Sequence, residues 1–350
     1  MRILVTGAAG FIGSTIVELL RDRGHEVVAV DLLLDRAHAS RPAWVGEDLH
    51  IVDVRDEAAL AKLLRGVDAV CHQAAMVGLG LTIHDAPDYA SHNVVGTASL
   101  VSAMARAEVA WLVQASSMVV YGGGREVCPV HGDVATRPRT TEDLAAGCFE
   151  PRCGVCGRQV SWGLVGEDAP LKPQNAYAAT KLAQEHVAVA WAEQSGGRAI
   201  SLRYHNVYGP RMPRDTPYAG VASIFRSALA AGRAPQVYED GLQMRDFVHV
   251  RDVAHANLAA LEGLTSSLGR TPGHRAYNVA SGRPRTVLDL ATALARELSG
   301  PEPAVVGGGR PGDVRHVVAD PARIRTELGF AAQVGFDEGI AEFAAAPMRS

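Results

Sequence analysis

The chain has 350 residues, of which 47% are hydrophobic and 21% are charged, and its formal net charge is −4. This composition is ordinary for a globular protein, and the slight acidic excess argues against nucleic acid or an anionic membrane as a partner. No apolar run is long enough to cross a bilayer, and the chain opens on a strand-like run instead of a signal peptide, so we expect a cytoplasmic location.

The first predicted elements are a strand, a glycine-rich turn and a helix. Arg2–Thr6 is a short apolar run, the turn contains Gly7, Gly10 and Gly13, and Phe11–Arg23 has the apolar period of a helix. In such a unit the first glycine makes the turn, the second admits a pyrophosphate and the third lets the helix pack closely. The helix N-terminus offers free N–H groups to the phosphates. The segment therefore predicts the start of a dinucleotide-binding βαβ unit, with a plain strand-to-helix turn as the alternative.

An acidic residue, Asp31, ends the second predicted strand, Glu26–Val30. A carboxylate at this point can accept both ribose hydroxyls of an adenosine and would repel a 2′-phosphate, so NAD is favoured over NADP. Further along, Asp53 and Val54 lie where the adenine ring would be held. Asp53 could equally cap the helix expected at Asp56–Leu64, which needs no ligand.

Apolar strands continue to alternate with helices as far as residue 204. Strands are expected near 48–52 and at Ala69–His72, Trp111–Ala115 and Ala199–Tyr204, and helices at Tyr89–Ala107 and Asn175–Gln194. This alternation predicts an α/β fold with a Rossmann-type, doubly wound parallel sheet whose strand carboxyl ends bind ligands. We expect a dinucleotide-binding domain at 1–208, with an inserted cysteine-rich segment at 122–173, and a smaller mixed α/β substrate lobe at 209–350.

Tyr177 and Lys181 give the sharpest catalytic signal. On a helix the two side chains lie one turn apart on the same face. A free tyrosine has a pKa of about 10, and a nearby lysine ammonium together with the positive nicotinamide of NAD⁺ would favour the phenolate. Tyr177 could then take a proton from a substrate hydroxyl as hydride leaves the same carbon, with Ser117 bonded to the same oxygen and Lys181 to the nicotinamide ribose. A solvated helix face is the alternative for this spacing.

With these motifs in place, the chain resembles the extended short-chain dehydrogenase/reductase family, which contains the nucleotide-sugar epimerases and dehydratases. The matching segments occur in the family's order and are TGAAGFIG, HQAA, SSMVVYG, YAATK, RYHNVYGP and RDFVHVRDV. The resemblance implies a Rossmann domain that carries NAD and a small C-terminal domain that holds a nucleotide diphosphosugar. It also implies a homodimer, usually formed through two helices from each subunit.

The resemblance carries over to individual positions. The catalytic positions are Ser117, Tyr177 and Lys181. The cofactor positions are Gly7, Gly10, Phe11, Ile12, Gly13, Asp31, Asp53, Val54, Ala74, Asn93, Tyr177, Lys181 and Tyr204. The substrate positions are Ser117, Tyr177, Asn206, Arg245 and Arg310. The two arginines match positions that hold the pyrophosphate, although any single arginine could equally be surface charge.

The residues after Ser117 bear on the reaction. Sugar 4,6-dehydratases of the family carry an Asp-Glu pair at this point, whereas this chain has Met118 and Val119, which cannot transfer protons. Hydride chemistry at C4 without elimination is therefore expected, and a preference for NAD fits a 4-epimerase that regenerates its cofactor in each cycle through a 4-keto sugar. The alternatives are an NAD(P)H-dependent nucleotide-sugar 4-ketoreductase and a non-catalytic NAD-binding regulator.

The cysteine-rich segment departs from the family pattern. It contains two Cys-x-x-ligand-Gly knuckles, which supply Cys128 with His131 and Cys153 with Cys156. Two such knuckles provide the four ligands of a tetrahedral zinc ion, and with no open position the zinc is expected to be structural. Cys148 is either a spare cysteine or an alternative to His131 as the fourth ligand. Reduced cysteines in a loop without metal are the alternative for the whole cluster.

The insertion also bears on the substrate. Ser117 and Tyr177 are 60 positions apart, about twice the usual spacing in the family. Similar cysteine-bearing insertions occur in relatives described as dTDP-L-rhamnose 4-epimerases, which suggests a dTDP-linked deoxyhexose. Because the insertion leads into Tyr177, it could cover the sugar pocket, and the segment 215–218 could do the same from the other lobe.

Overall fold

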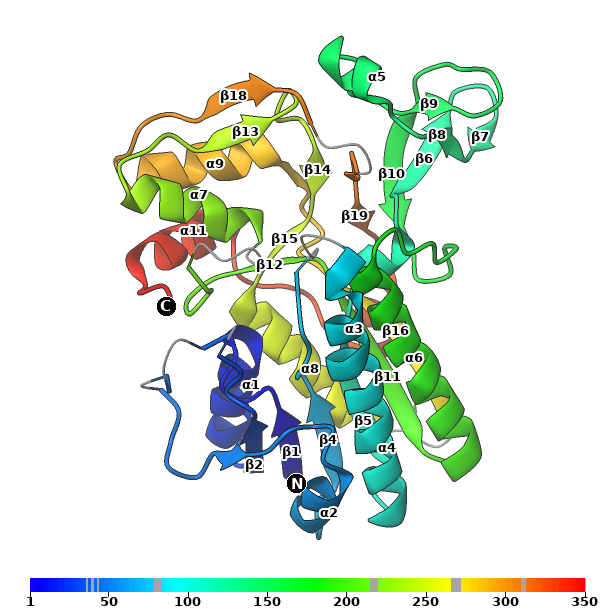
Figure 1. Cartoon of the computed structure of the whole chain (residues 1–350), viewed down its shortest axis with the longest axis vertical. Coiled ribbons are helices and arrows are strands. Elements are labelled where there is room, and N and C mark those ends of the chain that lie inside the picture. The colour runs from blue at the N-terminus through cyan, green and yellow to red at the C-terminus, as the bar shows by residue number, and fades with distance from the viewer. Residues whose placement is uncertain are drawn as a thin grey trace.

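A seven-stranded parallel sheet forms the centre of the fold (Figure 1). The computed structural model of the chain describes residues 1–35, 37–38, 41–42, 44–78, 83–214, 220–265, 272–309 and 313–349. The strand order is β16-β11-β5-β4-β1-β2-β3, and every neighbouring pair is parallel. The predicted Rossmann-type α/β sheet is thus confirmed. The strands are β1 (Arg2–Thr6), β2 (Glu26–Asp31), β3 (His50–Ile51), β4 (Ala69–His72), β5 (Trp111–Ser117), β11 (Arg198–Tyr204) and β16 (Gly273–Val279).

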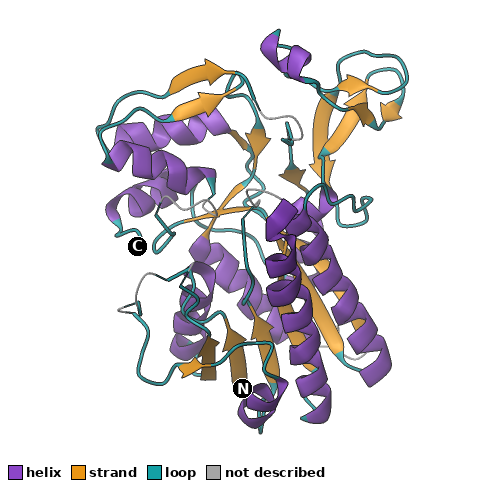
Figure 2. Cartoon of the chain, viewed as in Figure 1, coloured by secondary structure: helices purple, strands orange, loops and turns teal. Residues whose placement is uncertain are grey.

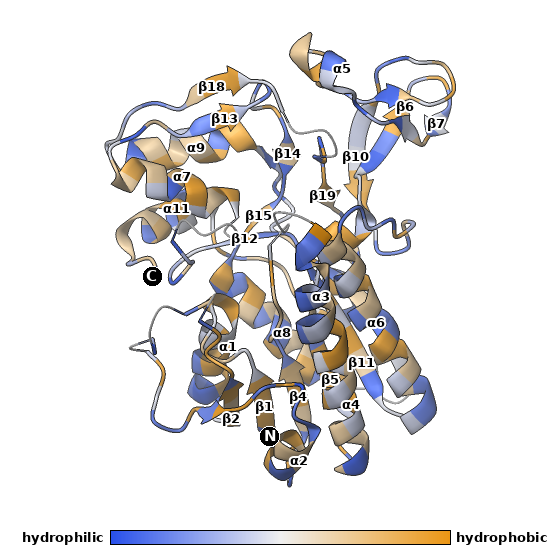
Figure 3. Ribbon diagram, viewed as in Figure 1, coloured by the Kyte–Doolittle hydropathy of each residue, from blue (hydrophilic) through white to orange (hydrophobic). Residues whose placement is uncertain are grey.

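Helices cover both faces of this sheet, and each face has its own hydrophobic core (Figure 2). On one face α1 (Phe11–Asp22) packs against α8 (Val250–Thr265), with α10 (Ala322–Leu328) beside them. On the other face lie α2 (Glu57–Leu63), α4 (Gly96–Arg106) and α6 (Ala176–Ser195). The strands are largely hydrophobic while the helices also carry hydrophilic patches (Figure 3), as expected for a sheet that is buried on both sides.

The single helix predicted over Tyr89–Ala107 is interrupted in the structure. It consists of η1 (Ile83–Asp85), α3 (Ala86–Tyr89), a π-helical turn η2 (Ala90–Val95) and then α4. Within the π turn Asn93 is fully buried, and its side-chain amide bonds both the N–H and the carbonyl of Met76. The wider turn therefore coincides with a side chain that ties this helix to the segment after β4, and π turns are frequent near functional sites.

A smaller lobe lies beyond the carboxyl ends of the strands (Figure 1). Its core joins α7 (Val221–Ala230), α9 (Val287–Glu297) and α11 (Phe336–Ala345). Short two-stranded pairs complete it: β12 (Asn206–Tyr208) with β15 (Phe247–His249), β13 (Gln236–Tyr238) with β18 (Ala304–Gly307), and β14 (Met244–Arg245) with β17 (Arg285–Thr286). The chain beyond residue 209 does not lie wholly in this lobe, because α8 packs on the sheet and β16 is its edge strand.

The inserted segment has regular structure of its own, which the loss of periodicity in the sequence did not predict. It contains β6 (Arg125–Cys128), β7 (Gly132–Asp133), β8 (Thr136–Arg137), α5 (Thr141–Ala145), β9 (Arg152–Cys153) and β10 (Ser161–Val165). Strands β7, β6 and β10 continue into β19 (Val318–Ala319), so the insertion is joined to a distant part of the chain. In the part of the chain that the structure describes, no helix is both long and apolar enough to cross a membrane.

Candidate active site

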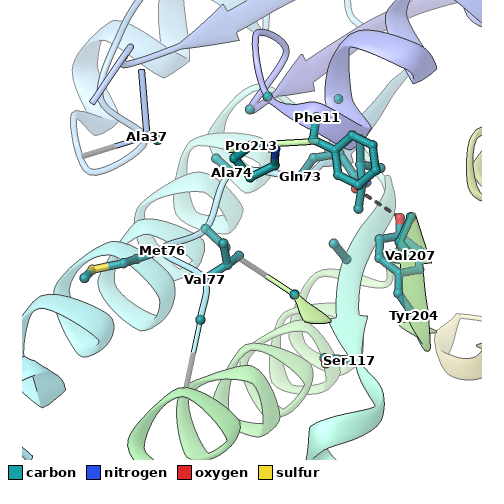
Figure 4. Close-up of a pocket in the computed structure, with 18 of the residues that line it drawn as sticks. Phe11, Ala37, Gln73, Ala74, Met76, Val77, Ser117, Tyr204, Val207 and Pro213 are labelled. Carbon is teal, nitrogen blue, oxygen red and sulfur yellow. Dashed lines mark hydrogen bonds between the residues drawn. The ribbon is translucent and has the colours of Figure 1, made fainter. Parts of the chain in front are cut away.

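A cavity of about 410 Å³ opens at the carboxyl ends of the central strands. Its wall includes the glycine turn after β1, the ends of β2, β4, β5 and β11, the start of α6 and the segment that leads into α7. Figure 4 shows Phe11 and Pro213 on one side of the cavity and Ser117, Tyr204 and Val207 on another. Ligand binding at this edge was predicted from the strand pattern, and the cavity lies there.

The glycine turn has the geometry that was expected of it. Gly7 adopts a left-handed backbone with φ +67°, and a Cβ added there would lie 2.7 Å from the N atom of Ala74. A Cβ on Gly13 would lie only 2.0 Å from the carbonyl oxygen of Gly7, so a side chain at this helix position would break the turn. The close approach of helix and turn leaves the N-terminus of α1 facing the cavity, where its N–H groups can bind phosphate.

The predicted adenosine positions also line the cavity. The Asp31 carboxylate accepts hydrogen bonds from the backbone N–H groups of Ala9 (3.0 Å) and Leu33 (2.8 Å), which fix its orientation at the end of β2. Asp53 is not the cap of α2, since Asp56 performs that role through a hydrogen bond from the Ala59 N–H (3.0 Å). Instead, hydrogen bonding to the Arg55 side chain lowers the pKa of Asp53. The alternative interpretation of Asp53 as a helix cap is therefore wrong.

Ser117, Tyr177 and Lys181 meet in the same cavity from different elements. Ser117 ends β5, and the other two lie on α6, whose N-cap Asn175 accepts a hydrogen bond from the Ala178 N–H (2.8 Å). A hydrogen bond with Ser117 lowers the pKa of Tyr177, but burial has the larger and opposite effect, and the pKa stands at about 12. Burial likewise lowers the pKa of Lys181 to about 7.

Burial raises the pKa of Tyr177 to about 12, whereas the Lys181 ammonium and the nicotinamide of NAD⁺ together were expected to favour its phenolate. The reason is geometric, because the Lys181 Nζ donates to the carbonyl of Ala115 (3.0 Å) while the phenol is enclosed in a low-dielectric wall. A further positive charge in the cavity would be needed to lower the pKa of Tyr177 toward neutrality.

Two of the predicted residues lie elsewhere. Asn93 is not part of the cavity wall; besides Met76 it bonds the Thr180 hydroxyl (3.0 Å) and so positions the helix that carries Tyr177. The Arg245 guanidinium is also outside the described wall, and it donates to the backbone carbonyls of residues 244, 314 and 315. Arg310 and the segment 215–218 lie outside the described residues.

The remaining predicted cofactor and substrate positions line the cavity. They are Gly7, Gly10, Phe11, Ile12, Gly13, Val54, Ala74, Tyr204 and Asn206. The Tyr204 hydroxyl donates to the Gln73 side chain (3.0 Å; Figure 4). The buried Oδ1 atom of Asn206 has no hydrogen-bond partner in the described structure. An unsatisfied acceptor in a cavity wall is expected where a ligand supplies the hydrogen-bond donor.

Sequence reasoning gave no role to two cavity residues, His205 and Arg349. Burial lowers the pKa of His205 to about 3, so its ring is neutral, and neither ring nitrogen has a hydrogen-bond partner in the described part of the chain. The motif RYHNVYGP pointed to this position without showing that its side chain faces the cavity. No local signal could have placed Arg349, because its proximity to Asp31 depends on how the end of the chain folds back.

The cysteine knuckles come together in the insertion. Ligand atoms of Cys128, His131, Cys153 and Cys156 all lie within 4.8 Å of one another. The Cys128 Sγ is 3.5 Å from the His131 Nδ1 and 3.7 Å from the Cys156 Sγ, and none of the cysteines is in a disulfide. A tetrahedral zinc ion with bonds of about 2.3 Å to sulfur would hold its ligand atoms roughly 3.5–3.8 Å apart. The donor set therefore fits zinc, and Cys148 lies outside the group.

Buried ion pairs connect the insertion to the lobe. Arg139 bonds Glu239 (2.7 Å), and Arg315 bonds Glu239 (2.7 Å) and Glu150 (2.7 Å). His316 extends the network to Glu150 (2.9 Å). The side chains of Arg139, Glu239 and Arg315 are at most 8% exposed, so these pairs are shielded from water. The insertion is thus fixed against the lobe and is not a free appendage.

Comparisons with known proteins agree with this site. The model of the NAD dependent epimerase/dehydratase family matches residues 3–144 and 161–280, and the unmatched residues between these parts lie in the insertion. A dTDP-L-rhamnose 4-epimerase from Burkholderia thailandensis is 34% identical over 97% of this chain and 93% of its own length. A UDP-glucose 4-epimerase from Mycolicibacterium smegmatis is 33% identical over 98% of this chain and 97% of its own.

Solved structures give the same fold for more than one activity. The Thermus thermophilus UDP-glucose 4-epimerase in complex with NAD has a TM-score of 0.76 at 30% identity, covering 98% of each chain. The Streptomyces venezuelae dTDP-glucose 4,6-dehydratase with NAD bound also has a TM-score of 0.76, at 28% identity, covering 98% of this chain and 96% of its own. The fold alone therefore does not separate epimerisation from dehydration, and the residues of the cavity must do so.

Proposed function

The chain belongs to the NAD dependent epimerase/dehydratase family, and on that premise we propose that it is an NAD-dependent nucleotide-sugar 4-epimerase. Its two relatives described above are both named as 4-epimerases. The cavity joins a dinucleotide-binding turn to a Ser-Tyr-Lys group, which is the combination that reversible oxidation of a sugar hydroxyl needs.

In this proposal Ser117 and Tyr177 bind the oxygen on C4 of the sugar. Tyr177 takes the proton of that hydroxyl and later returns it to the ketone oxygen, and Ser117 keeps the oxygen in place. Bound NAD would accept the hydride from C4 and return it to the opposite face of the sugar. Lys181 lies one turn from Tyr177, on the side where the nicotinamide ribose is expected, and its ammonium would support the phenolate once its Ala115 contact is exchanged for the ribose.

One observation supports epimerisation over elimination of water. Among the described residues that line the cavity, the only carboxylates are those of Asp31 and Asp53, and both belong to the predicted adenosine end. Met118 and Val119 begin the short η3 helix (Met118–Tyr121), and neither lines the cavity. Elimination across C5 and C6 needs an acid and a base beside the sugar. Among the described residues at the reactive end, the groups that could transfer a proton are the Ser-Tyr-Lys group and His205, whose ring is neutral.

We further propose a dTDP-linked deoxyhexose as the substrate. This rests on the cysteine-bearing insertion and on the dTDP-L-rhamnose 4-epimerase that is similar along nearly the whole chain. Besides Ser117 and Tyr177, we propose that Asn206 binds the substrate, because its Oδ1 atom is buried without a partner in the cavity wall. The roles of Arg245 and Arg310 in holding a pyrophosphate stay predictions, as do the homodimer and the cytoplasmic location.

A substrate panel tests the proposed activity. The purified protein is incubated with dTDP-, UDP- and GDP-hexoses without added cofactor, and products are separated by chromatography and identified by NMR. We expect a mixture of C4 epimers with no net change in NADH, with the highest rate on a dTDP-deoxyhexose. Consumption of 4-keto sugars only with added NADH or NADPH would replace the epimerase by the ketoreductase, and inactivity in both assays would favour a non-catalytic regulator.

We also propose that Cys128, His131, Cys153 and Cys156 hold one structural zinc ion. Both knuckles end in a glycine with a left-handed backbone, Gly132 (φ +68°) and Gly157 (φ +72°), which lets the chain turn tightly around a metal. Although burial opposes ionisation, hydrogen bonds from the backbone N–H groups of Val130 and His131 lower the pKa of Cys128 to about 6, which favours the thiolate ligand. Zinc would supply cross-links that the small sheet of the insertion needs.

Replacing Cys153 tests the zinc site, with Cys148 as a matched control. We expect Cys153→Ser to lose the zinc that the wild-type protein carries at one ion per chain, and to lower the unfolding temperature, because a three-ligand site binds structural zinc much more weakly. Cys148→Ser should keep the full zinc content, since Cys148 lies outside the cluster. Metal analysis and thermal unfolding give both values; unchanged zinc in Cys153→Ser would refute the site.

A further inference from the structure

The segment after α11 folds back onto the cavity. The N–H of Arg349 donates to the carbonyl of Met212 (3.1 Å), and the N–H of Arg214 donates to the carbonyl of Arg349 (2.7 Å). Figure 1 shows this end of the chain beside the loop that follows β12. Met212, Pro213 and Arg349 all line the cavity, so the main-chain pairing holds the side chain of Arg349 in the cavity wall.

A second set of contacts fixes the same segment. The Arg226 guanidinium, on α7, donates to the carbonyl of Ala344 (3.1 Å) and to that of Ala346. On the other side of the loop, Arg211 bonds Glu18 of α1 (2.5 Å). The loop and the segment paired with it are thus anchored both to the lobe and to the helix that begins at the glycine turn. Arg349 is held at the junction of the two parts that enclose the cofactor cavity.

Two of the three guanidinium nitrogens of Arg349 lack partners. The Nε and Nη1 atoms are buried and have no hydrogen-bond partner in the described structure. Burial lowers the pKa of Arg349, while the charge of Asp31 acts in the opposite direction. Asp31 does not form an ion pair with Arg349, and its carboxylate oxygens accept hydrogen bonds from the N–H groups of Ala9 and Leu33 instead. Buried guanidinium N–H groups without hydrogen bonds are unfavourable, and an anionic ligand in the cavity would supply the missing acceptors.

We propose that Arg349 binds the diphosphate of the dinucleotide cofactor, facing the phosphate-binding N–H groups at the start of α1. Arg349 is the only arginine among the described residues that line the cavity, and Lys181 is directed to the carbonyl of Ala115. A guanidinium can bond two phosphate oxygens at once, and here it would add a positive charge to the backbone N–H groups that the glycine turn offers. The inference rests on the proposed function only in taking a dinucleotide as the cofactor.

The surroundings of Asp31 favour the diphosphate over a 2′-phosphate as the anion. A phosphate on the adenosine ribose would lie against the Asp31 carboxylate, which repels it. His38 is near, with its Nε2 atom 3.8 Å from the Asp31 Oδ1, but burial lowers the pKa of His38 more than the charge of Asp31 raises it, and the charge of Arg349 lowers it further. A neutral His38 adds no positive charge for a 2′-phosphate, so the Arg349 cation is left for the diphosphate.

Cofactor binding to three variants tests the inference. Dissociation constants for NAD and NADP are measured by calorimetry on cofactor-free protein for the wild type, Arg349→Ala, Arg349→Lys and Arg214→Ala. We expect Arg349→Ala to weaken NAD binding about 10- to 100-fold and Arg349→Lys to recover part of the loss, as for one charge-assisted phosphate contact. Arg214→Ala removes the same charge from an exposed side chain on the paired segment and should bind NAD like the wild type.

The affinities of Arg349→Ala for different ligands show which part of the dinucleotide Arg349 binds. ADP-ribose should lose affinity in Arg349→Ala to the same extent as NAD, whereas adenosine should bind equally to both proteins. Unchanged NAD affinity in Arg349→Ala, a loss confined to NADP, or an equal loss for adenosine would each overturn the assignment to the diphosphate. Failure of the wild type to bind any dinucleotide would instead refute the proposed function, so the two failures are distinguishable.

Discussion

Replacing Tyr177 by phenylalanine is expected to lower kcat by about 10²- to 10⁴-fold, the usual contribution of a general acid–base group. The variant loses the phenol hydroxyl that belongs to the group of Ser117, Tyr177 and Lys181, while its ring still packs against that of Tyr89 at 5.8 Å between centroids. NAD content should be unchanged, because the glycine turn, Asp31 and Lys181 are untouched. Steady-state rates on the epimerised sugar, with NAD released by denaturation and quantified, measure both effects.

Tyr89→Phe is the matched control for this prediction. Tyr89 is fully buried, and its hydroxyl donates to the carbonyl of Gly78 (3.0 Å), but it does not line the cavity. We expect Tyr89→Phe to keep kcat within a few-fold of the wild type, at the cost of about 1 kcal/mol of stability for one hydrogen bond. If Tyr177→Phe turned over as fast as Tyr89→Phe, Tyr177 would not be the proton-transferring group.

The largest expected effect on stability comes from Arg203→Met. Arg203, on β11, forms a bidentate pair with Glu185 on α6, at 3.0 and 2.8 Å, and both side chains are 4% exposed. Ser116 donates to the same carboxylate, and Arg203 also bonds the hydroxyl of Tyr121 (3.0 Å). Removing the arginine leaves a buried carboxylate without its counter-ion, and we expect the free energy of unfolding to fall by about 3–5 kcal/mol. Chemical denaturation measures the loss.

An exposed ion pair and a double variant are the controls. Arg275, near the start of β16, pairs with Glu327, and the Arg275 side chain is 50% exposed. Arg275→Met should therefore lower the free energy of unfolding by at most about 1 kcal/mol. The double variant Glu185→Met/Arg203→Met removes both charges and should recover part of the loss in Arg203→Met. Equal losses in Arg203→Met and Arg275→Met would mean that the buried pair does not hold α6, and with it Tyr177, against the sheet.

The sequence was sufficient to predict those parts of the site that are formed by residues close together in the chain. The turn from Gly7 to Gly13 and the pair Tyr177 and Lys181 are each set by the spacing within one element, and the structure brings them into one cavity. Both cysteine knuckles could be recognised from the sequence for the same reason, because each is a four-residue turn followed by a glycine. The parallel sheet was predicted from the alternation of apolar strands with helices, because an apolar strand in such a pattern is buried on both faces of the sheet.

The sequence was insufficient to predict contacts between side chains from distant segments of the chain. Arg245 matches a family position, yet its donors are taken by three backbone carbonyls, a competition that only the packing of residues 314–315 reveals. Asn93 was expected at the cofactor and instead fixes Met76 and Thr180. Strand β16 was not predicted because its sequence, GHRAYNV, has no continuous apolar run. Arg349 reaches the cavity only through main-chain pairing with residues 212–214.

Isotope transfer tests the epimerase proposal most directly. A nucleotide sugar deuterated at C4, chosen as the best substrate in the panel, is equilibrated with the protein in ordinary water without added cofactor, and both epimers are examined by NMR and mass spectrometry. If hydride leaves C4 and returns to the same carbon, the epimer retains its deuterium at C4. Loss of the C4 label to solvent, or conversion only when reduced cofactor is supplied, would contradict the proposal.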